Sequence, residues 1–287
     1  MQQERVLVLG AASWLGYLLL NQLGSTNSAT VLGGTLHQLD VDFEMPVTKY
    51  KPTGYDDYVQ AIDEFAPTVL VNFLRGEDEQ GLQIHQHCIA YATASGAYYV
   101  YASSVLALDG YTDVPLTEDL PANSLSEYGI FKGRCEDLLK ASSINWCALR
   151  FASLQGWVPH RVTRNENLLK KLQSGQQITV DRGVVQNRML ASDMIKGVAM
   201  LIAQRVNGII HFGSTDSSEE YHFLREQAKA FGYSPDLVTS GSQRKVNLVA
   251  IPGRIFELFG DEFKTTEQDT LNGLLAIPQL KQYTNFN

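Results

Sequence analysis

Short apolar runs alternate with amphipathic stretches along the first half of the chain. The run from Arg5 to Gly10 is apolar and ends in glycine, and leucines at helical spacing then continue to Gly24. This pattern predicts a buried strand, a turn and a helix. Similar apolar runs predict further strands at 30–35, 68–74, 97–103 and 144–151. Helical spacing predicts helices between them at 56–65, 82–94 and 126–141.

The alternation predicts an α/β fold: a doubly wound parallel sheet of the Rossmann type, with helices on both faces. We assign residues 1–152 to this domain and expect a strand at 208–212, within 191–213, to return to its sheet. Weaker patterns predict a helix at 166–173, a short strand at 178–180 and a helix at 191–203. Residues 153–190 and 214–287 are expected to form a smaller, discontinuous substrate-binding lobe over the strand ends, where ligands of open α/β sheets bind.

Composition narrows the class of protein. The 287 residues are 44% hydrophobic and 19% charged, and no apolar run reaches the roughly 18 residues of a membrane helix. The first residues enter a strand pattern at once, so we expect no secretory signal and a cytoplasmic protein. A formal charge of −8 argues against nucleic-acid binding.

Cysteines and histidines do not form a metal-site pattern. Cys88, Cys135 and Cys147 are widely spaced and odd in number, which favours reduced thiols over a disulfide framework. His85 and His87 are two residues apart on a predicted helix, so their side chains point apart, and no carboxylate cluster joins them. We therefore expect no bound metal.

The turn after the first strand carries the first candidate chemistry. Gly10 and Gly16 would let the backbone approach a pyrophosphate, and the following helix would present unpaired N–H groups to its charge. An ordinary tight turn is the alternative. Because the turn directly follows the first strand, we predict a nucleotide site that includes Ser13, Trp14 and Leu15.

A tyrosine and a lysine form the second candidate group. Tyr128 and Lys132 are four residues apart, so both side chains would emerge on one helix face. The ammonium is expected to lower the phenol pKa from about 10 toward neutrality, for proton transfer to or from a carbonyl group. Ser103 and Ser104 follow a predicted strand 24 residues upstream. A surface Tyr–Lys pair and strand-capping serines are the alternatives.

These motifs resemble the extended short-chain dehydrogenases/reductases, with Ser13 in place of the middle glycine of their turn. The segment from Glu118 to Gly129 resembles that of dTDP-4-dehydrorhamnose reductases, and the resemblance covers about residues 4–232. It implies that Ser104 hydrogen-bonds a substrate carbonyl, completing a catalytic group with Tyr128 and Lys132. Lys132 would also hold the nicotinamide ribose.

The resemblance also implies the ligands. The expected reaction is NAD(P)H-dependent reduction of a keto group on a nucleotide-sugar or similar anionic substrate. The second predicted strand ends without an acidic residue for an NAD ribose and without an arginine for the 2′-phosphate of NADP. NADP(H) is favoured and NAD(H) is the alternative, with Thr35, His37 and Phe73 as contacts. Arg188 would contact the substrate diphosphate and Trp157 the substrate, with an ion pair and a buried structural role as their alternatives. Arg161 to Arg164 is interpreted as a solvated loop, with an anion site as the alternative.

Two other functions remain open on the same scaffold. One is an epimerase or dehydratase that retains NAD. The other is a non-catalytic regulatory protein, similar to the reductase-like regulatory subunit of methionine adenosyltransferase, which the departures at Ser13, Pro52 and Gly81 favour. The resemblance further implies a homodimer formed through helices that flank the sheet.

Overall fold

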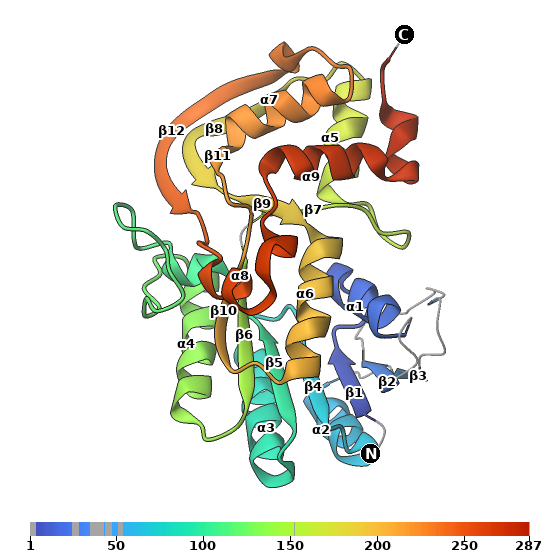
Figure 1. Cartoon of the computed structure of the whole chain (residues 1–287), viewed down its shortest axis with the longest axis vertical. Coiled ribbons are helices and arrows are strands. Elements are labelled where there is room, and N and C mark those ends of the chain that lie inside the picture. Colours follow the sequence, from blue (N-terminus) through green and yellow to red (C-terminus); the bar gives the residue numbers. More distant parts are fainter. Residues whose placement is uncertain are drawn as a thin grey trace.

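The computed structural model describes residues 4–24, 29–34, 43, 48–50, 54–151 and 153–286, with the backbone alone for 29–34 and 48–50. A parallel sheet with helices on both faces forms the larger part of the molecule, and a smaller lobe stands over one end of it (Figure 1). Thr35 and His37, which the sequence predicts as cofactor contacts, lie outside the described residues.

Seven parallel strands form the main sheet in the order β10-β6-β5-β4-β1-β2-β3. They are β1 (Glu4–Leu9), β2 (Ala29–Gly34), β3 (Thr48–Tyr50), β4 (Val69–Asn72), β5 (Tyr98–Ala102), β6 (Trp146–Phe151) and β10 (Gly208–Phe212). The order reverses between β1 and β4, the kind of position at which such sheets bind ligands. The predicted fold class and the return of the strand at 208–212 are both confirmed.

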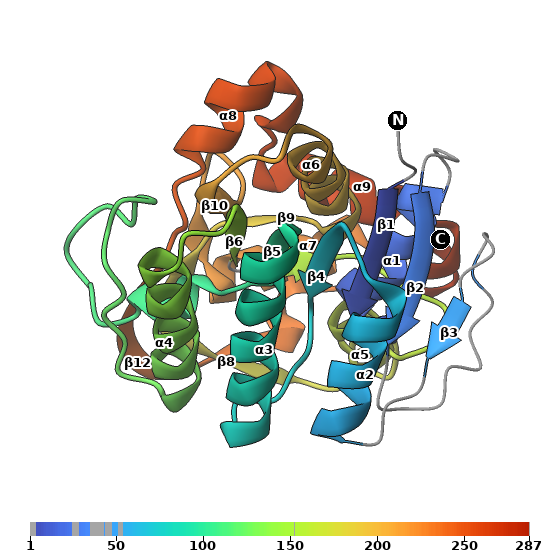
Figure 2. The ribbon, with the colours of Figure 1, turned by 90° about the horizontal axis from the view of Figure 1, so that it is seen from below.

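Helices cover the two faces of the sheet in separate groups, as Figure 2 shows. One face carries α2 (Tyr55–Phe65), α3 (Glu79–Ser95) and α4 (Glu127–Ala141), and the other carries α1 (Trp14–Gly24), α6 (Ala191–Gln204) and α8 (Gly253–Phe259). Two hydrophobic cores result, one on each side. All four residues of β4 are buried, because side chains on both faces meet a helix layer.

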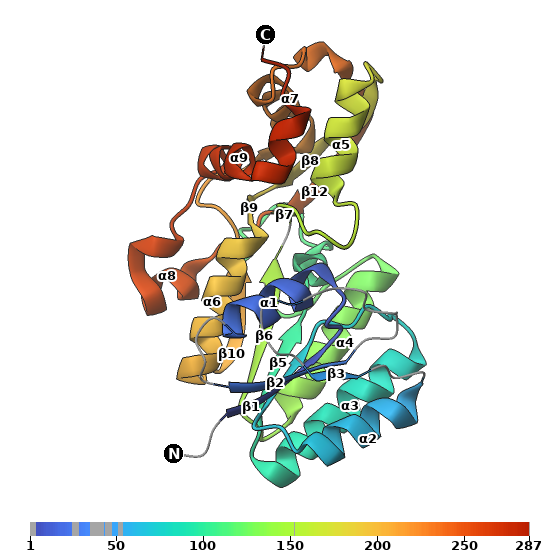
Figure 3. The same ribbon diagram turned by 90° about the vertical axis from the view of Figure 1, so that its right-hand side faces the viewer.

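The smaller lobe has its own hydrophobic core and a three-stranded sheet, seen above the main sheet in Figure 3. Its elements are α5 (Arg164–Gln173), β8 (Ile178–Gln186), β11 (Ser218–Glu219), α7 (Glu220–Ala230), β12 (Val238–Leu248) and α9 (Glu267–Ala276). A two-stranded pair, β7 (Ser153–Gln155) with β9 (Arg188–Leu190), lies between the lobe and the main sheet. The 3-10 turns are η1 (Val105–Leu108), η2 (Pro235–Leu237), η3 (Gly260–Phe263) and η4 (Pro278–Tyr283).

Several elements of the C-terminal half differ from the predictions. The short strand expected at 178–180 runs on to Gln186, and β12 was not predicted because most of its side chains are polar or charged. α8 and η3 pack on the main-sheet core beside α6, although they fall within the predicted second lobe at 214–287. The proposed domain boundaries stay a prediction. No helix within the described residues is long and apolar enough to cross a membrane.

Candidate active site

The glycine turn joins β1 to α1 and forms one wall of a cavity. Gly10 has a φ of +81°, and a Cβ there would lie 2.7 Å from the carbonyl oxygen of Phe73, so only glycine fits. Ser13 Oγ accepts a hydrogen bond of 3.0 Å from the backbone N–H of Gly16 and thus caps the helix. The N–H groups of Trp14 and Leu15 have no carbonyl partner within the first helical turn.

A close approach between α4 and η1 positions the tyrosine. Ser126 caps α4 by accepting from the Gly129 N–H at 3.2 Å. A Cβ at Gly129 would overlap the carbonyl oxygen of Leu106, so glycine after the tyrosine lets α4 pack directly on η1, which follows β5. Ser104, Tyr128 and Lys132 consequently line one cavity of about 520 Å³, which Ser13, Trp14, Leu15 and Phe73 also line. We call it the catalytic cavity.

Lys132 lies beneath the tyrosine rather than in solvent. Its side chain is buried, and Nζ donates a 3.0 Å hydrogen bond to the carbonyl oxygen of Ala102. Nζ also lies 4.9 Å from the ring centre of Tyr101 and 5.4 Å from that of Tyr128. Burial lowers the pKa of Lys132 to about 8.

The tyrosine is not activated in the way the sequence predicted. Burial is the largest influence and raises the pKa of Tyr128, while the guanidinium of Arg75 and a hydrogen bond with Ser104 act against it. The expected lowering toward neutrality by Lys132 is therefore wrong for this structure, because desolvation outweighs the nearby charges. The phenol is protonated at neutral pH.

The two serines after β5 have different environments. Ser103 donates a 2.6 Å hydrogen bond to Oε1 of Glu136, whose other oxygen pairs with the fully buried Arg150 at 2.5 Å. Ser104 Oγ accepts from the N–H of Leu106 at 3.1 Å, and its own proton is directed to the Tyr128 oxygen rather than to a carboxylate. Both serines line the cavity, and Ser104 is the one whose hydroxyl hydrogen-bonds Tyr128.

Three arginines also line the catalytic cavity: Arg75, Arg161 and Arg164. The segment that carries Arg161 is docked on the glycine turn, because His160 Nε2 lies 3.0 Å from the carbonyl oxygen of Ala12. The favoured interpretation of 161–164, a solvated loop, does not account for these contacts, and the alternative, an anion site, fits the place of Arg161 and Arg164 in the cavity lining. The described lining of the cavity includes no carboxylate, so its charge is positive. In the sequence, the only feature that indicated this positively charged lining was the basic cluster from Arg161 to Arg164.

The two predicted substrate contacts lie elsewhere. The guanidinium of Arg188 is fully buried, pairs with Glu220 at 2.7 Å and with Glu267, and lies 4.2 Å over the ring of Phe223. Trp157 packs against the core of the small lobe. Neither residue lines the catalytic cavity. The expected diphosphate contact is therefore corrected to an ion pair, with glutamates far along the chain as partners.

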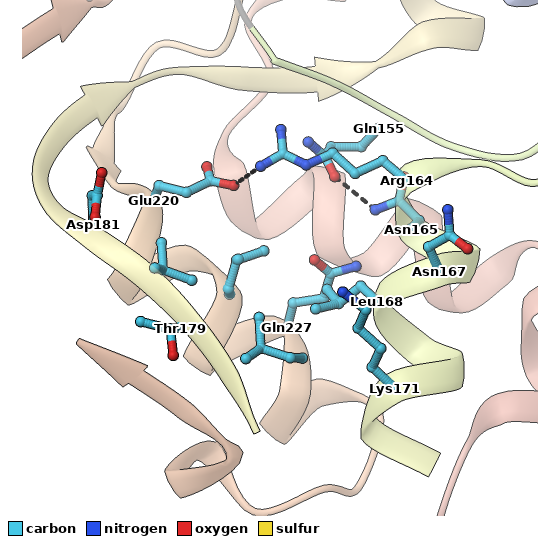
Figure 4. Close-up of a pocket in the computed structure, with 13 residues that line it drawn as sticks. Gln155, Arg164, Asn165, Asn167, Leu168, Lys171, Thr179, Asp181, Glu220 and Gln227 are labelled. Atoms are coloured by element: carbon cyan, nitrogen blue, oxygen red, sulfur yellow. Dashed lines mark hydrogen bonds and ion pairs between the residues drawn. The ribbon is translucent and has the colours of Figure 1, made fainter. Parts of the chain in front are cut away.

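A second cavity of about 450 Å³ lies in the small lobe between α5, β8 and α7 (Figure 4). Four of its polar side chains form pairs within the lining: Arg164 with Glu220, and Asn165, whose Nδ2 donates to Gln155 Oε1 at 2.7 Å. Figure 4 shows Lys171 on α5 beside this lining with no dashed contact. We call it the lobe cavity.

The histidine of the predicted helix 82–94 serves the core. His85 is buried, with Nδ1 2.8 Å from the hydroxyl of Tyr99 and Nε2 3.0 Å from the carbonyl oxygen of Cys135. Both ring nitrogens are thus occupied. Within the described ranges, no group of three or more His, Cys, Asp or Glu side chains is placed to hold a metal ion.

The sheet order and the glycine turn define a Rossmann-type α/β fold, as predicted, and solved structures of sugar-nucleotide enzymes share this fold. Solved structures of this kind resemble the chain over nearly its whole length. A dTDP-4-dehydrorhamnose reductase from Clostridium acetobutylicum has a TM-score of 0.78 and 20% identity, covering 96% of this chain and 99% of its own. A dTDP-glucose 4,6-dehydratase from Bacillus anthracis, in complex with NAD, has a TM-score of 0.79 and 12% identity, with 98% and 100% covered.

A UDP-N-acetylglucosamine 4-epimerase from Bacillus cereus is similar as well, with a TM-score of 0.74, 17% identity and 96% of each chain covered. At these identities the likeness shows the fold alone. No model of a known protein family matches the chain, and no curated protein matches it either.

Proposed function

We propose that the protein is an NAD(P)H-dependent reductase of a keto group on a nucleotide-linked sugar or similar anionic substrate. The observation that carries the proposal is a single cavity that joins the glycine turn to Ser104, Tyr128 and Lys132. Cofactor-binding and proton-donating groups are thereby brought together at the strand ends, and the positive lining suits anionic ligands.

The residues present fit a nicotinamide cofactor. Gly10 lets the turn pack tightly against the backbone of Phe73, and the N–H groups of Trp14 and Leu15 in the first turn of α1 suit a pyrophosphate. Phe73 supplies an apolar wall, and Lys132 can donate to ribose hydroxyls. When bound, the cofactor supplies the hydride that reduces the carbonyl carbon.

The polar side chains account for the proton. The substrate carbonyl oxygen accepts hydrogen bonds from Ser104 and Tyr128, which polarise the C=O bond. As the carbon gains hydride, Tyr128 gives its proton to the oxygen, which yields an alcohol and a tyrosinate that solvent reprotonates. A raised phenol pKa keeps Tyr128 in the acid form that reduction needs. This favours a reductase over a function that begins with proton abstraction.

Three finer statements belong to the proposal. NADPH is the preferred cofactor, on the grounds of the second strand's sequence. A cytoplasmic location is supported by three buried free cysteines. A homodimer through the helices on the α2, α3 and α4 face is supported by Ile130, an apolar side chain that is 48% exposed on α4.

Titration with NADPH and with NADH tests the proposal, with nicotinamide fluorescence and the quenching of Trp14 as readouts. Micromolar binding that favours NADPH, followed by turnover of a keto sugar nucleotide, is the expected result. NAD that copurifies tightly with the protein would instead identify an NAD-retaining epimerase or dehydratase. Absence of any nicotinamide binding would leave the regulatory protein.

A further inference from the structure

Arg75 lines the catalytic cavity and forms no ion pair with the residues that the structure describes. It follows β4 in a loop, its side chain is exposed, and it lines the cavity. Within the described part of the chain no carboxylate lies within ion-pair distance of it, and no hydrogen bond to it is formed. Arg150 and Arg188, by contrast, are each held by buried glutamates. An unpaired guanidinium beside a catalytic group is available to a ligand.

The guanidinium is close to the proton donor. Its central carbon lies 5.9 Å from the ring centre of Tyr128, and its positive charge acts to lower the pKa of the phenol. Glu77 lies in the same loop, and its negative charge acts to raise the pKa of both Tyr128 and Lys132. It does not form an ion pair with Arg75. An anion bound to Arg75 would therefore lie beside a carbonyl group that accepts a proton from Tyr128.

The position separates this arginine from the cofactor phosphates. The pyrophosphate is expected at the glycine turn, where His160 docks the segment that carries Arg161. Arg75 lies instead at the Tyr128 end of the cavity. A guanidinium presents two parallel N–H donors, a geometry that matches a carboxylate.

We infer that Arg75 binds a carboxylate of the substrate, and that this carboxylate lies close to the carbonyl group that is reduced. The substrate is therefore an oxo acid. If it is a nucleotide sugar, its sugar is a keto sugar acid. The inference rests on the proposed reductase function and narrows its substrate class. Arg75 then determines specificity: it orients the carbonyl toward Tyr128 and Ser104 and selects against uncharged analogues.

The test uses the complex of the full chain with NADPH, or with NADH if that binds better. Oxamate, which places a carboxylate beside a carbonyl, is titrated against its neutral analogue oxamide, and nicotinamide fluorescence is followed. Arg75→Met and Arg75→Lys are compared with wild type. Arg134→Met is the matched control, because Arg134 is an exposed arginine on α4 that lines a different, smaller hollow.

We expect oxamate to bind at least tenfold more tightly than oxamide, Arg75→Met to abolish that preference, and Arg75→Lys to restore part of it. Cofactor affinity should be unchanged in all three variants. Equal binding of both probes, or an unchanged preference in Arg75→Met, overturns the inference and leaves the reductase function intact. Weaker cofactor binding in Arg75→Met assigns the arginine to the cofactor and overturns it too. If neither nicotinamide binds wild type, the proposed function fails, and the inference fails with it.

Discussion

The catalytic cavity and the lobe cavity both contain arginine, but they hold it differently. In the catalytic cavity, Arg75 and Arg161 have no carboxylate partner among the residues that the structure describes. At the lobe cavity, Glu220 accepts from Arg164 and also from the buried Arg188. Removing the partner of a buried charge destabilises the fold, whereas an unpaired charge is available for a ligand. The contrast indicates which polar groups matter for binding and which for folding.

Replacement of the tyrosine should give the largest effect on the catalytic side. In Tyr128→Phe we expect kcat to fall by roughly 10²–10⁴-fold, because the proton donor is lost while the ring remains. Affinity for NADPH should stay within about twofold of wild type, since the phenol is not needed to hold the cofactor. Steady-state assays and cofactor titration measure the two quantities separately. Full turnover by this variant would rule out the assigned role.

Loss of a carboxylate should give the largest effect on the lobe side. Glu220→Gln keeps the shape of the side chain but leaves buried Arg188 with Glu267 alone. We expect the free energy of unfolding to fall by about 3 kcal/mol, measured by denaturant titration. Asp181→Asn is the control: its pair with Arg244 spans 3.6 Å between exposed side chains and should contribute less than about 1 kcal/mol. Equal losses in both variants would contradict the distinction between buried and exposed pairs.

The lysine should make cofactor binding depend on pH. Because burial lowers the pKa of Lys132 to about 8, its ammonium is lost as pH rises through that value, and NADPH affinity should fall over the same range. An unfolded lysine keeps its proton to about pH 10.4, so the contribution of this group to stability should instead increase from about pH 8 to that point. Titrations at a series of pH values measure both trends. The inflection in binding should vanish in Lys132→Arg; its persistence there would point to another group.

The smallest effect is expected for an unpaired arginine at the cofactor end. Arg161→Met should weaken NADPH binding by about fivefold, which corresponds to roughly 1 kcal/mol. Its free energy of unfolding should not change, since no ion pair within the described residues is broken. A loss of stability comparable with that of Glu220→Gln would erase the contrast between the two cavities.

The sequence predicted the main sheet and the meeting of Tyr128 with Lys132 because local patterns determine both. Alternating apolar runs identify β4 and β5, and a helical spacing of four residues puts Tyr128 and Lys132 on one face. The role of Ser13 could have been found from its position, since a serine directly before a helix is a common N-cap.

The arginines could not be assigned from local patterns. Arg188 is neutralised by Glu220 and Glu267, which lie 32 and 79 residues further along the chain, and only the folded small lobe brings them together. Arg75 and Arg161 come from loops that no periodicity describes. Strand β12 escaped prediction for a related reason: its polar side chains lie on a sheet that is largely open to solvent.

Arg164 lines both cavities and pairs with Glu220. A ligand in either cavity that contacted this side chain would do so next to its ion pair with Glu220. Two such ligands would be thermodynamically linked through Arg164, and each would change the affinity of the other by the same factor.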